Sequence, residues 1–186
     1  MESDTKTFGF WIYLMTDLII FAVLFATYLV LRHNTFEGPS GRELFSVPFA
    51  LVETLILLVS SFTCALAMVA IHQGQKKSAT SWFIVTFLLG LSFLVLEVGE
   101  FSKFMKEGAG PQRSAFLSAF FTLVGMHGLH IFAGLLWMIV AIFRIWLRPL
   151  LGSSISRIFR MALFWHFLDF VWIFIFTVVY GMGHLF

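Results

Sequence analysis

Ionisable side chains stand inside long apolar segments of this chain, where they could take part in proton, metal or haem chemistry. All 12 basic residues lie outside those segments, whereas five of the 10 acidic residues and three of the six histidines lie inside them. The acids are Asp17, Glu53, Glu97, Glu100 and Asp169, and the histidines are His127, His130 and His166. An ionised carboxylate at the bilayer centre costs at least about 2.5–3.5 kcal/mol. Each carboxyl must therefore be protonated, bonded to a histidine or completed by another chain.

Three pairs of these side chains stand three residues apart, which places each pair on one helix face. The pairs are Glu97 with Glu100, His127 with His130, and His166 with Asp169. Carboxylate-bridged di-iron bundles use Glu and Glu-x-x-His motifs on facing helices, so a metal site is one interpretation. Two observations argue against it: no Glu-x-x-His occurs, and Glu100 is predicted too far from His166 for all three pairs to meet.

Haem ligation is a second interpretation of the same histidines. The axial ligands would be His166 and either His127 or His130, on facing helices. A histidine inside a membrane also serves as an interhelical hydrogen-bond donor, which contributes about 0.6–2 kcal/mol in lipid. Because a second well-spaced histidine pair is missing, the sequence favours this structural role over haem ligation.

Asp17 and Glu53 each allow a structural and a functional interpretation. A protonated Asp17 could donate to a carbonyl on a neighbouring helix, or it could be a carboxyl that exchanges protons and reacts with carbodiimides. Glu53 could take part in the same chemistry or only extend toward the external headgroups. Small residues let helices approach closely, which predicts packing positions at Gly125, Gly128 and Gly134.

Five segments are long and apolar enough to position these residues as membrane-spanning helices. The 186 residues are 60% hydrophobic and only 12% charged, against about 25% charged in a soluble domain. A bilayer core of about 30 Å needs roughly 20 helical residues. The predicted spans are 8–31, 47–71, 81–101, 115–143 and 161–182. We expect an all-α fold, a single membrane domain over residues 1–186 built as a bundle of five transmembrane helices.

Depth along these spans groups the buried polar residues into two predicted layers. The inner layer, about 10–15 Å from the face where the chain starts, is expected to hold Asp17, His166 and Asp169, in the first and fifth spans. The outer layer, at roughly 20–25 Å, is expected to hold Glu53, Glu97, His127 and His130, with Glu100 near the opposite surface.

The distribution of basic residues predicts the orientation. Seven Lys and Arg residues lie outside the spans on the side of the N-terminus, and five lie on the other side. Basic residues are more frequent in cytoplasmic loops. We therefore expect a cytoplasmic N-terminus and an external C-terminus.

Several segments resemble subunit III of the haem–copper oxidases. They are Phe8–Asp17, Ala50–Thr54, Gly110–Ser114 leading into Gly125–His130, and Trp165–Trp172 followed by Phe176–Tyr180. The resemblance runs over nearly the whole chain. The joint occurrence of His-Gly-x-His and Trp-His-Phe-x-Asp-x-x-Trp is highly specific. Within the family, the chain is most similar to the branch found in bacterial cytochrome bo-type ubiquinol oxidases.

The resemblance implies a function for a complex rather than for this chain alone. Such oxidases reduce oxygen to water with electrons from ubiquinol and pump protons across the bacterial cytoplasmic membrane. Their haems and copper lie in subunit I. Subunit III binds no redox centre, packs against subunit I, holds lipids in a cleft and protects the core from inactivation during turnover. The resemblance thus implies no catalytic, cofactor or metal site in this chain, a bound phospholipid, and no nucleic acid.

Site residues follow from the same resemblance. We expect His127, His130, His166 and Asp169 to maintain contacts between helices and subunits, and Trp165 and Trp172 to serve packing. At the position of Asp17, cytochrome c oxidases commonly carry a carbodiimide-reactive Glu. Larger relatives also have two helices before the first one seen here, so the resemblance leads us to expect a lipid cleft that is either open or filled by another subunit.

Two other functions remain as alternatives. A related subunit III-like protein accompanies nitric oxide reductase and is similar to five-helix members of this family. An independent proton-coupled transporter would use Asp17, Glu53 and Asp169. Transporters usually show inverted repeats and helices broken at mid-membrane, and the sequence shows neither.

Overall fold

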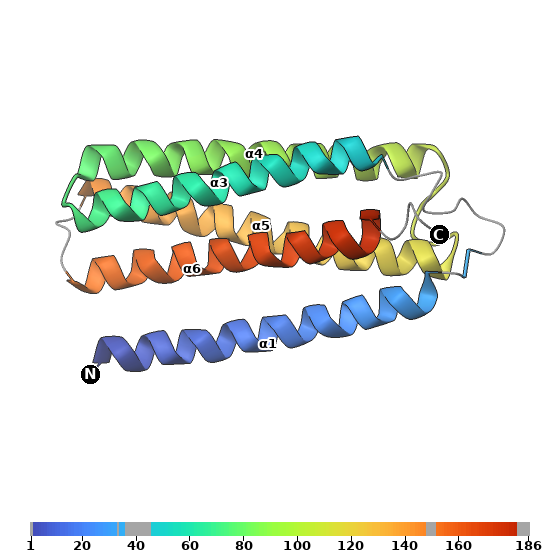
Figure 1. Ribbon diagram of the computed structural model, residues 1–186, viewed down its shortest axis with the longest axis horizontal. Helices are drawn as coiled ribbons and strands as arrows, with labels where there is room; N and C mark the ends of the chain where they lie inside the picture. The colour runs from blue at the N-terminus through green and yellow to red at the C-terminus, as the bar shows by residue number, and fades with distance from the viewer. Residues whose placement is uncertain (1, 33, 36–45, 148–151, 182–186) are drawn as a thin grey trace.

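The computed structural model is a bundle of five long helices that run along one axis (Figure 1). It describes residues 2–32, 34–35, 46–147 and 152–181. The helices are α1 (Glu2–Leu31), α3 (Val47–His72), α4 (Lys76–Lys106), α5 (Ala115–Leu147) and α6 (Gly152–Ile175), with a π-helix, η1 (Phe176–Gly181), directly after α6. The described residues contain no strand, and the predicted all-α fold is confirmed.

All five helices are long and apolar enough to cross a membrane. Their outward faces expose large apolar side chains such as Val30, Phe62 and Val95, the inverse of what a water-soluble bundle shows. The chain is therefore a multi-pass membrane protein.

The helices are longer than the predicted spans. Helix α4 has 31 residues, about 46 Å at 1.5 Å per residue, against a hydrocarbon core of about 30 Å. The five predicted spans lie inside the observed helices, apart from Met182, which lies outside the described residues. The additional turns carry polar residues, such as Lys76 and Lys106 at the two ends of α4, so hydropathy could not detect them.

Glycines in the left-handed region end two helices and reverse the chain. Gly74 has φ of 72° and Gly108 has φ of 76°. The N–H of the residue after each glycine donates back to a carbonyl of the last turn, Gln75 to Ala70 and Ala109 to Phe104, both at 2.9 Å. This is a Schellman motif, for which glycine is the preferred residue. The first of these turns joins α3 and α4 as an antiparallel hairpin.

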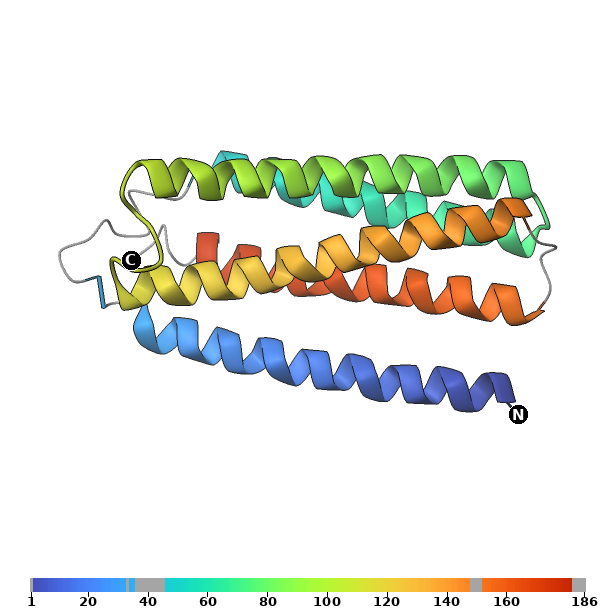
Figure 2. The ribbon, with the colours of Figure 1, turned by 180° about the vertical axis from the view of Figure 1, so that it is seen from behind.

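Helices α3, α4, α5 and α6 surround the core, and α1 forms one edge. Neighbouring contacts join α3 with α4, α4 with α5, α5 with α6 and α3 with α6, while α1 packs on α5 and α6. Opposite views show α1 beside the start of α5 and diverging from α5 toward its own N-terminal end (Figures 1 and 2). The start of α1, the α3–α4 turn and the start of α6 lie at one end of the bundle, because the four helices before α6 cross it in alternating directions.

Two buried indole rings connect α6 with α3. Trp165 and Trp172 are seven residues apart on α6 and are fully buried. The Trp165 Nε1–H donates to Ser60 Oγ (2.9 Å), and the Trp172 Nε1–H donates to Thr54 Oγ1 (3.0 Å). Each ring thus fills core volume and has a partner for its polar atom, which a buried indole needs.

Candidate functional site

Asp17 of α1 and His130 of α5 face each other across the edge of the bundle. The distance from His130 Nε2 to Asp17 Oδ2 is 3.7 Å, and Asp17 is 6% exposed. His130 Nδ1 lies 2.8 Å from the carbonyl oxygen of Met126. Because a carbonyl only accepts, Nδ1 carries a proton and donates. Nε2 is then the nitrogen left to face Asp17, and at 3.7 Å the two side chains make an electrostatic contact between α1 and α5 that is longer than a hydrogen bond.

We expect Asp17 and His130 to be energetically coupled. Asp17→Asn and His130→Leu, alone and combined, should give a coupling free energy of about 0.6–1.7 kcal/mol. The measurement is the extent to which Cys64 reacts with a thiol reagent as the purified complex is heated. Cys64 is the only cysteine of the chain and is fully buried, so its labelling by a fluorescent maleimide reports opening of the bundle.

A second cycle serves as the control for this coupling. Asp17→Asn combined with His166→Leu should give additive effects, because His166 contacts Ser61 of α3 whereas Asp17 contacts His130 of α5. Additive effects in the Asp17–His130 cycle would contradict the pair.

Helices α3 and α6 meet at a second polar contact. His166 Nδ1 lies 2.5 Å from Ser61 Oγ. Asp169, one turn further along α6, is 6% exposed, and its two oxygens have no hydrogen-bonding partner among the described residues. Ser61, His166 and Asp169 are the residue types of a hydrolase triad, but here His166 and Asp169 lie on one helix inside the membrane. The contact therefore joins two helices rather than activating a nucleophile for an aqueous substrate.

Three carboxyl groups and one phenol form a buried cluster toward the other end of the bundle. Glu53 of α3 and Glu97 and Glu100 of α4 are 0%, 2% and 8% exposed. The Tyr180 hydroxyl donates to Glu100 Oε2 at 2.9 Å. The oxygens of Glu53 and Glu97 have no hydrogen-bonding partner among the described residues. Both are buried within the single chain, which does not favour completion by another chain among the three alternatives that the sequence leaves open.

The π-helix explains why Tyr180 reaches this cluster. Element η1 continues α6 with a wider turn from Phe176 to Gly181, which changes the direction of the side chains that follow. Single π-turns inside α-helices are frequent at functional sites. Tyr180 is fully buried there and packs on Trp172, with ring centroids 6.3 Å apart.

His127 of α5 is surrounded by aromatic rings in the core of the bundle. It is 0% exposed, and neither ring nitrogen has a hydrogen-bonding partner among the described residues. Its ring centroid is 5.2 Å from that of Trp172 and 6.0 Å from that of Phe93. This histidine acts as a packed ring, although it stands only three residues from His130.

The two predicted layers differ from the observed grouping. Asp17, expected with His166 and Asp169, instead pairs with His130, and His166 contacts α3 rather than α1. The depth estimate assumed untilted helices and fixed span ends, whereas α1 is inclined to α5 (Figure 2). Glu53, Glu97 and Glu100 lie within electrostatic range of one another.

The metal and haem interpretations find no support in this geometry. Within residues 2–32, 34–35, 46–147 and 152–181, no group of three or more His, Cys, Asp or Glu side chains could hold a metal ion. The ring nitrogens of His130 face Asp17 and a backbone carbonyl, and His166 Nδ1 faces Ser61. These histidines do not point at one another as a pair of axial ligands would.

The predicted packing glycines on α5 make unequal contacts. A Cβ at Gly128 would lie 2.8 Å from Glu97 Oε1, and one at Gly134 would lie 3.1 Å from Trp165 Cζ3. At Gly125 the nearest atom would be 3.6 Å away, an ordinary contact. Gly128 and Gly134 therefore make room for a carboxyl and for an indole.

Sequence reasoning missed the hydroxyl residues that complete these contacts. Thr54, Ser60 and Ser61 of α3 meet Trp172, Trp165 and His166. The adjacent serines in an apolar helix were the available signal, because membrane helices use Ser and Thr for interhelical hydrogen bonds.

Comparison with known proteins identifies the family. The family model described as cytochrome c oxidase subunit III matches residues 3–184. Cytochrome bo(3) ubiquinol oxidase subunit 3 of Pseudomonas aeruginosa is 59% identical over 184 residues, which cover 99% of this chain and 88% of that protein. Quinol oxidase subunit 3 of Bacillus spizizenii is 45% identical, and the alignment covers 98% of this chain and 92% of that protein.

A third relative has a different electron donor, cytochrome c, in its name. Cytochrome c oxidase subunit 3 of Bacillus sp. (strain PS3) is 44% identical, and the alignment covers 98% of this chain and 88% of that protein. The three names all denote oxidase subunits, which does not favour the nitric oxide reductase or the transporter alternative. The chain, with its His-Gly-x-His and Trp-His-Phe-x-Asp-x-x-Trp motifs, belongs to the cytochrome c oxidase subunit III family.

Proposed function

We propose that the chain is an accessory, non-redox subunit of a proton-pumping ubiquinol oxidase in aerobic respiration. The observation that carries the proposal is the 59% identity, over 99% of the chain, to a protein named as subunit 3 of a ubiquinol oxidase. In this proposal, subunit I holds the haems and copper and carries out the chemistry. The enzymatic activity belongs to the complex and not to this chain alone.

Ubiquinol is the electron donor that we infer for the complex. The relative that bears cytochrome c in its name is 44% identical to this chain, against 59% for the ubiquinol oxidase relative. The donor is oxidised elsewhere in the complex, so none of the buried polar residues described above is assigned to quinol chemistry.

The buried polar residues support a structural role for this chain. Asp17–His130 joins α1 to α5, Ser61–His166 joins α3 to α6, and Tyr180–Glu100 joins η1 to α4. We propose that these contacts keep the bundle in the shape that subunit I recognises. The mostly apolar, exposed outer faces of the helices are left for subunit I, for other oxidase subunits and for lipid.

We infer that the chain lies in the bacterial cytoplasmic (inner) membrane with its N-terminus in the cytoplasm and its C-terminus outside. The end of the bundle that holds the start of α1 also carries Lys76, Arg144, Arg157 and Arg160. Cytoplasmic ends of membrane proteins are enriched in such residues. Five crossings then place the other end of the chain on the external side.

Removing this chain should leave the catalytic chemistry of the complex in place and shorten its working life. A complex purified without the chain is expected to keep its haem spectrum and its initial rate of ubiquinol-dependent oxygen uptake per haem. Its activity should decline faster during continuous turnover, because the surface of subunit I that the chain covers is then exposed to detergent and solvent. Oxygen-electrode traces recorded to exhaustion measure both quantities.

The control is the depleted complex to which the purified chain has been added back. Adding the chain back should restore the slow decline. Loss of the initial rate in a depleted complex that retains all its haem would contradict an accessory role, and an unchanged rate of decline would contradict a protective one.

A further inference from the structure

Helices α3 and α6 share one outward side of the bundle. Helix α1 packs on α5 and α6, and α4 packs on α3 and α5. Leu58 and Ala65 of α3 and Phe159 and Ile173 of α6 are exposed. Residues 159, 166 and 173 are seven apart and therefore follow one line along α6, with His166 in the middle. We call these five residues the α3–α6 face.

His166 brings a polar atom to the centre of this face. Its Nδ1 lies 2.5 Å from Ser61 Oγ. Its Nε2 has no hydrogen-bonding partner among the described residues and, unlike the ring nitrogens of His127, is not enclosed by the protein. His166 stands 14 residues after the start of α6 and 15 before the end of η1, roughly 20 Å from each. An imidazole cannot reach the headgroups from that depth, so Nε2 needs a partner within the membrane.

Other polar side chains on the outer faces are satisfied within the chain. The hydroxyls of Thr16, Thr27 and Ser92 each donate to the carbonyl oxygen four residues earlier, at 2.8–2.9 Å. Both ring nitrogens of His130 face groups of this chain. Since lipid tails offer no hydrogen bond, an unsatisfied polar group is costly in the hydrocarbon region. His166 Nε2 therefore calls for a group from another protein.

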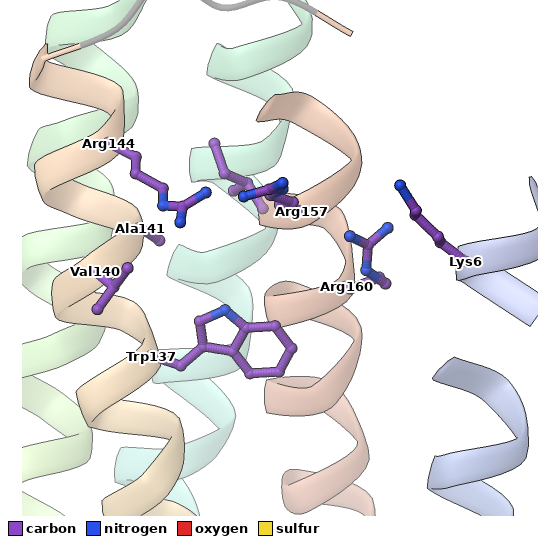
Figure 3. Close-up of a pocket in the computed structure, with 8 residues that line it drawn as sticks. Lys6, Trp137, Val140, Ala141, Arg144, Arg157 and Arg160 are labelled. Atoms are coloured by element: carbon purple, nitrogen blue, oxygen red, sulfur yellow. The ribbon is translucent and has the colours of Figure 1, made fainter. Parts of the chain in front are cut away.

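The charged groups of α6 lie away from this face. Figure 3 shows the guanidinium group of Arg157 turned toward Arg144 of α5, and that of Arg160 turned toward Lys6 of α1. Arg157 and His166 are nine residues apart, which is two and a half turns, so they lie on opposite sides of α6. The α3–α6 face is thus an apolar surface with one polar atom at mid-depth.

Small residues beside His166 leave room for another helix. Ser61 and Ala65 are four residues apart and lie on the same side of α3. Small residues at this spacing are typical of membrane helices in close contact, where Ser and His side chains also form hydrogen bonds between helices.

We propose that a membrane-spanning helix of subunit I packs on the α3–α6 face, and that His166 Nε2 forms a hydrogen bond with a hydroxyl, amide or carboxyl side chain at mid-depth of that helix. The inference rests on the proposed function, in which subunit I is the partner of this chain. It adds the face that makes the contact and the polar atom at its centre.

Photo-cross-linking in the intact complex tests the face. Benzoylphenylalanine, a photoreactive analogue of phenylalanine, replaces Phe159 or, as the matched control, Phe132. The two are 45% and 49% exposed, but Phe132 lies in the groove between α4 and α5. We expect position 159 to cross-link to subunit I and position 132 not to do so, with mass spectrometry identifying the products. Equal yields with subunit I from both positions, or products from position 159 only with lipid, another subunit or a second copy, would overturn the face.

Two variants of His166 test its outward nitrogen. His166→Asn keeps an amide two bonds from Cβ, where Nδ1 stands, whereas His166→Gln places the amide three bonds away, where Nε2 stands. The affinity of the purified chain for the complex depleted of it is measured by fluorescence anisotropy, with the label on the tag. We expect His166→Asn to bind about 3- to 15-fold more weakly than the unmodified chain and His166→Gln to bind nearly as tightly. An Asn variant that binds as tightly as the Gln variant would overturn the role of Nε2.

The proposed function is judged separately. If the face fails these tests while haem still co-purifies with the unmodified chain, the accessory role stands and the contact with subunit I lies elsewhere. If no haem co-purifies with the unmodified chain, both fail.

Discussion

Replacing Trp165 with alanine is expected to lower the free energy of unfolding of this chain by about 3–5 kcal/mol. The indole is fully buried and connects three helices: its Nε1–H donates to Ser60 of α3, and its ring lies against Gly90 of α4 and Gly134 of α5. Its loss leaves a cavity between these helices and leaves the Ser60 hydroxyl without its donor. Maleimide labelling of Cys64 in the purified complex, followed against temperature, measures the change.

Trp146→Ala provides the matched control, because Trp146 is 79% exposed and lies near the end of α5. Its removal should shift the labelling midpoint far less than the removal of Trp165. Equal shifts for the two tryptophans would contradict the packing that the structure shows around Trp165.

The second large effect is expected from adding one methyl group at Gly90. A Cβ there would lie 2.6 Å from Trp165 Cη2 and 3.1 Å from Leu135 Cδ2, and real Cβ atoms essentially never show contacts under 3.0 Å. The indole cannot move aside without losing its hydrogen bond to Ser60. Gly90→Ala should therefore destabilise the chain by about 1–3 kcal/mol, read out by the same Cys64 labelling.

Gly99 on the same helix makes a sharp control, since a Cβ there would have nothing within 4 Å. Gly99→Ala should be neutral or stabilising by up to about 1 kcal/mol, because alanine favours a helix more than glycine does. A smaller ring at position 165 should also reduce the clash with the new methyl group. Gly90→Ala should therefore lower the free energy of unfolding by less in a Trp165→Phe background than in the unmodified chain. A cost that is the same at Gly90 and Gly99, or the same in both backgrounds, would count against the contact.

These two glycines show how far sequence reasoning reaches. Five helices could be predicted because the thickness of a bilayer sets the length of an apolar run, and that length is visible in the sequence. Which face of each helix turns inward depends on its rotation and tilt. Gly90 and Gly99 stand nine residues apart in one apolar segment and look alike, yet only Gly90 meets Trp165.

The polar contacts show the same limit. Asp17, His130, His166 and Glu100 could be recognised from their types, since an ionisable residue in an apolar run needs an explanation. Their partners could not be found by depth alone. The divergence of α1 gives Asp17 a different neighbour from the one estimated, and the π-turn that directs Tyr180 to Glu100 has no signature in the hydropathy of residues 176–181.

The central claim is that this chain is a colourless subunit of a ubiquinol oxidase. The most direct measurement is a mild-detergent purification through a tag on this chain, with an optical spectrum, mass spectrometry of the co-purified proteins and an oxygen-uptake assay. The predicted result is haem absorbance, a catalytic subunit I and ubiquinol-dependent oxygen uptake in the complex, all absent from the chain once it is isolated. A chain that purifies alone and moves protons in liposomes, or that carries stoichiometric haem by itself, would contradict the claim.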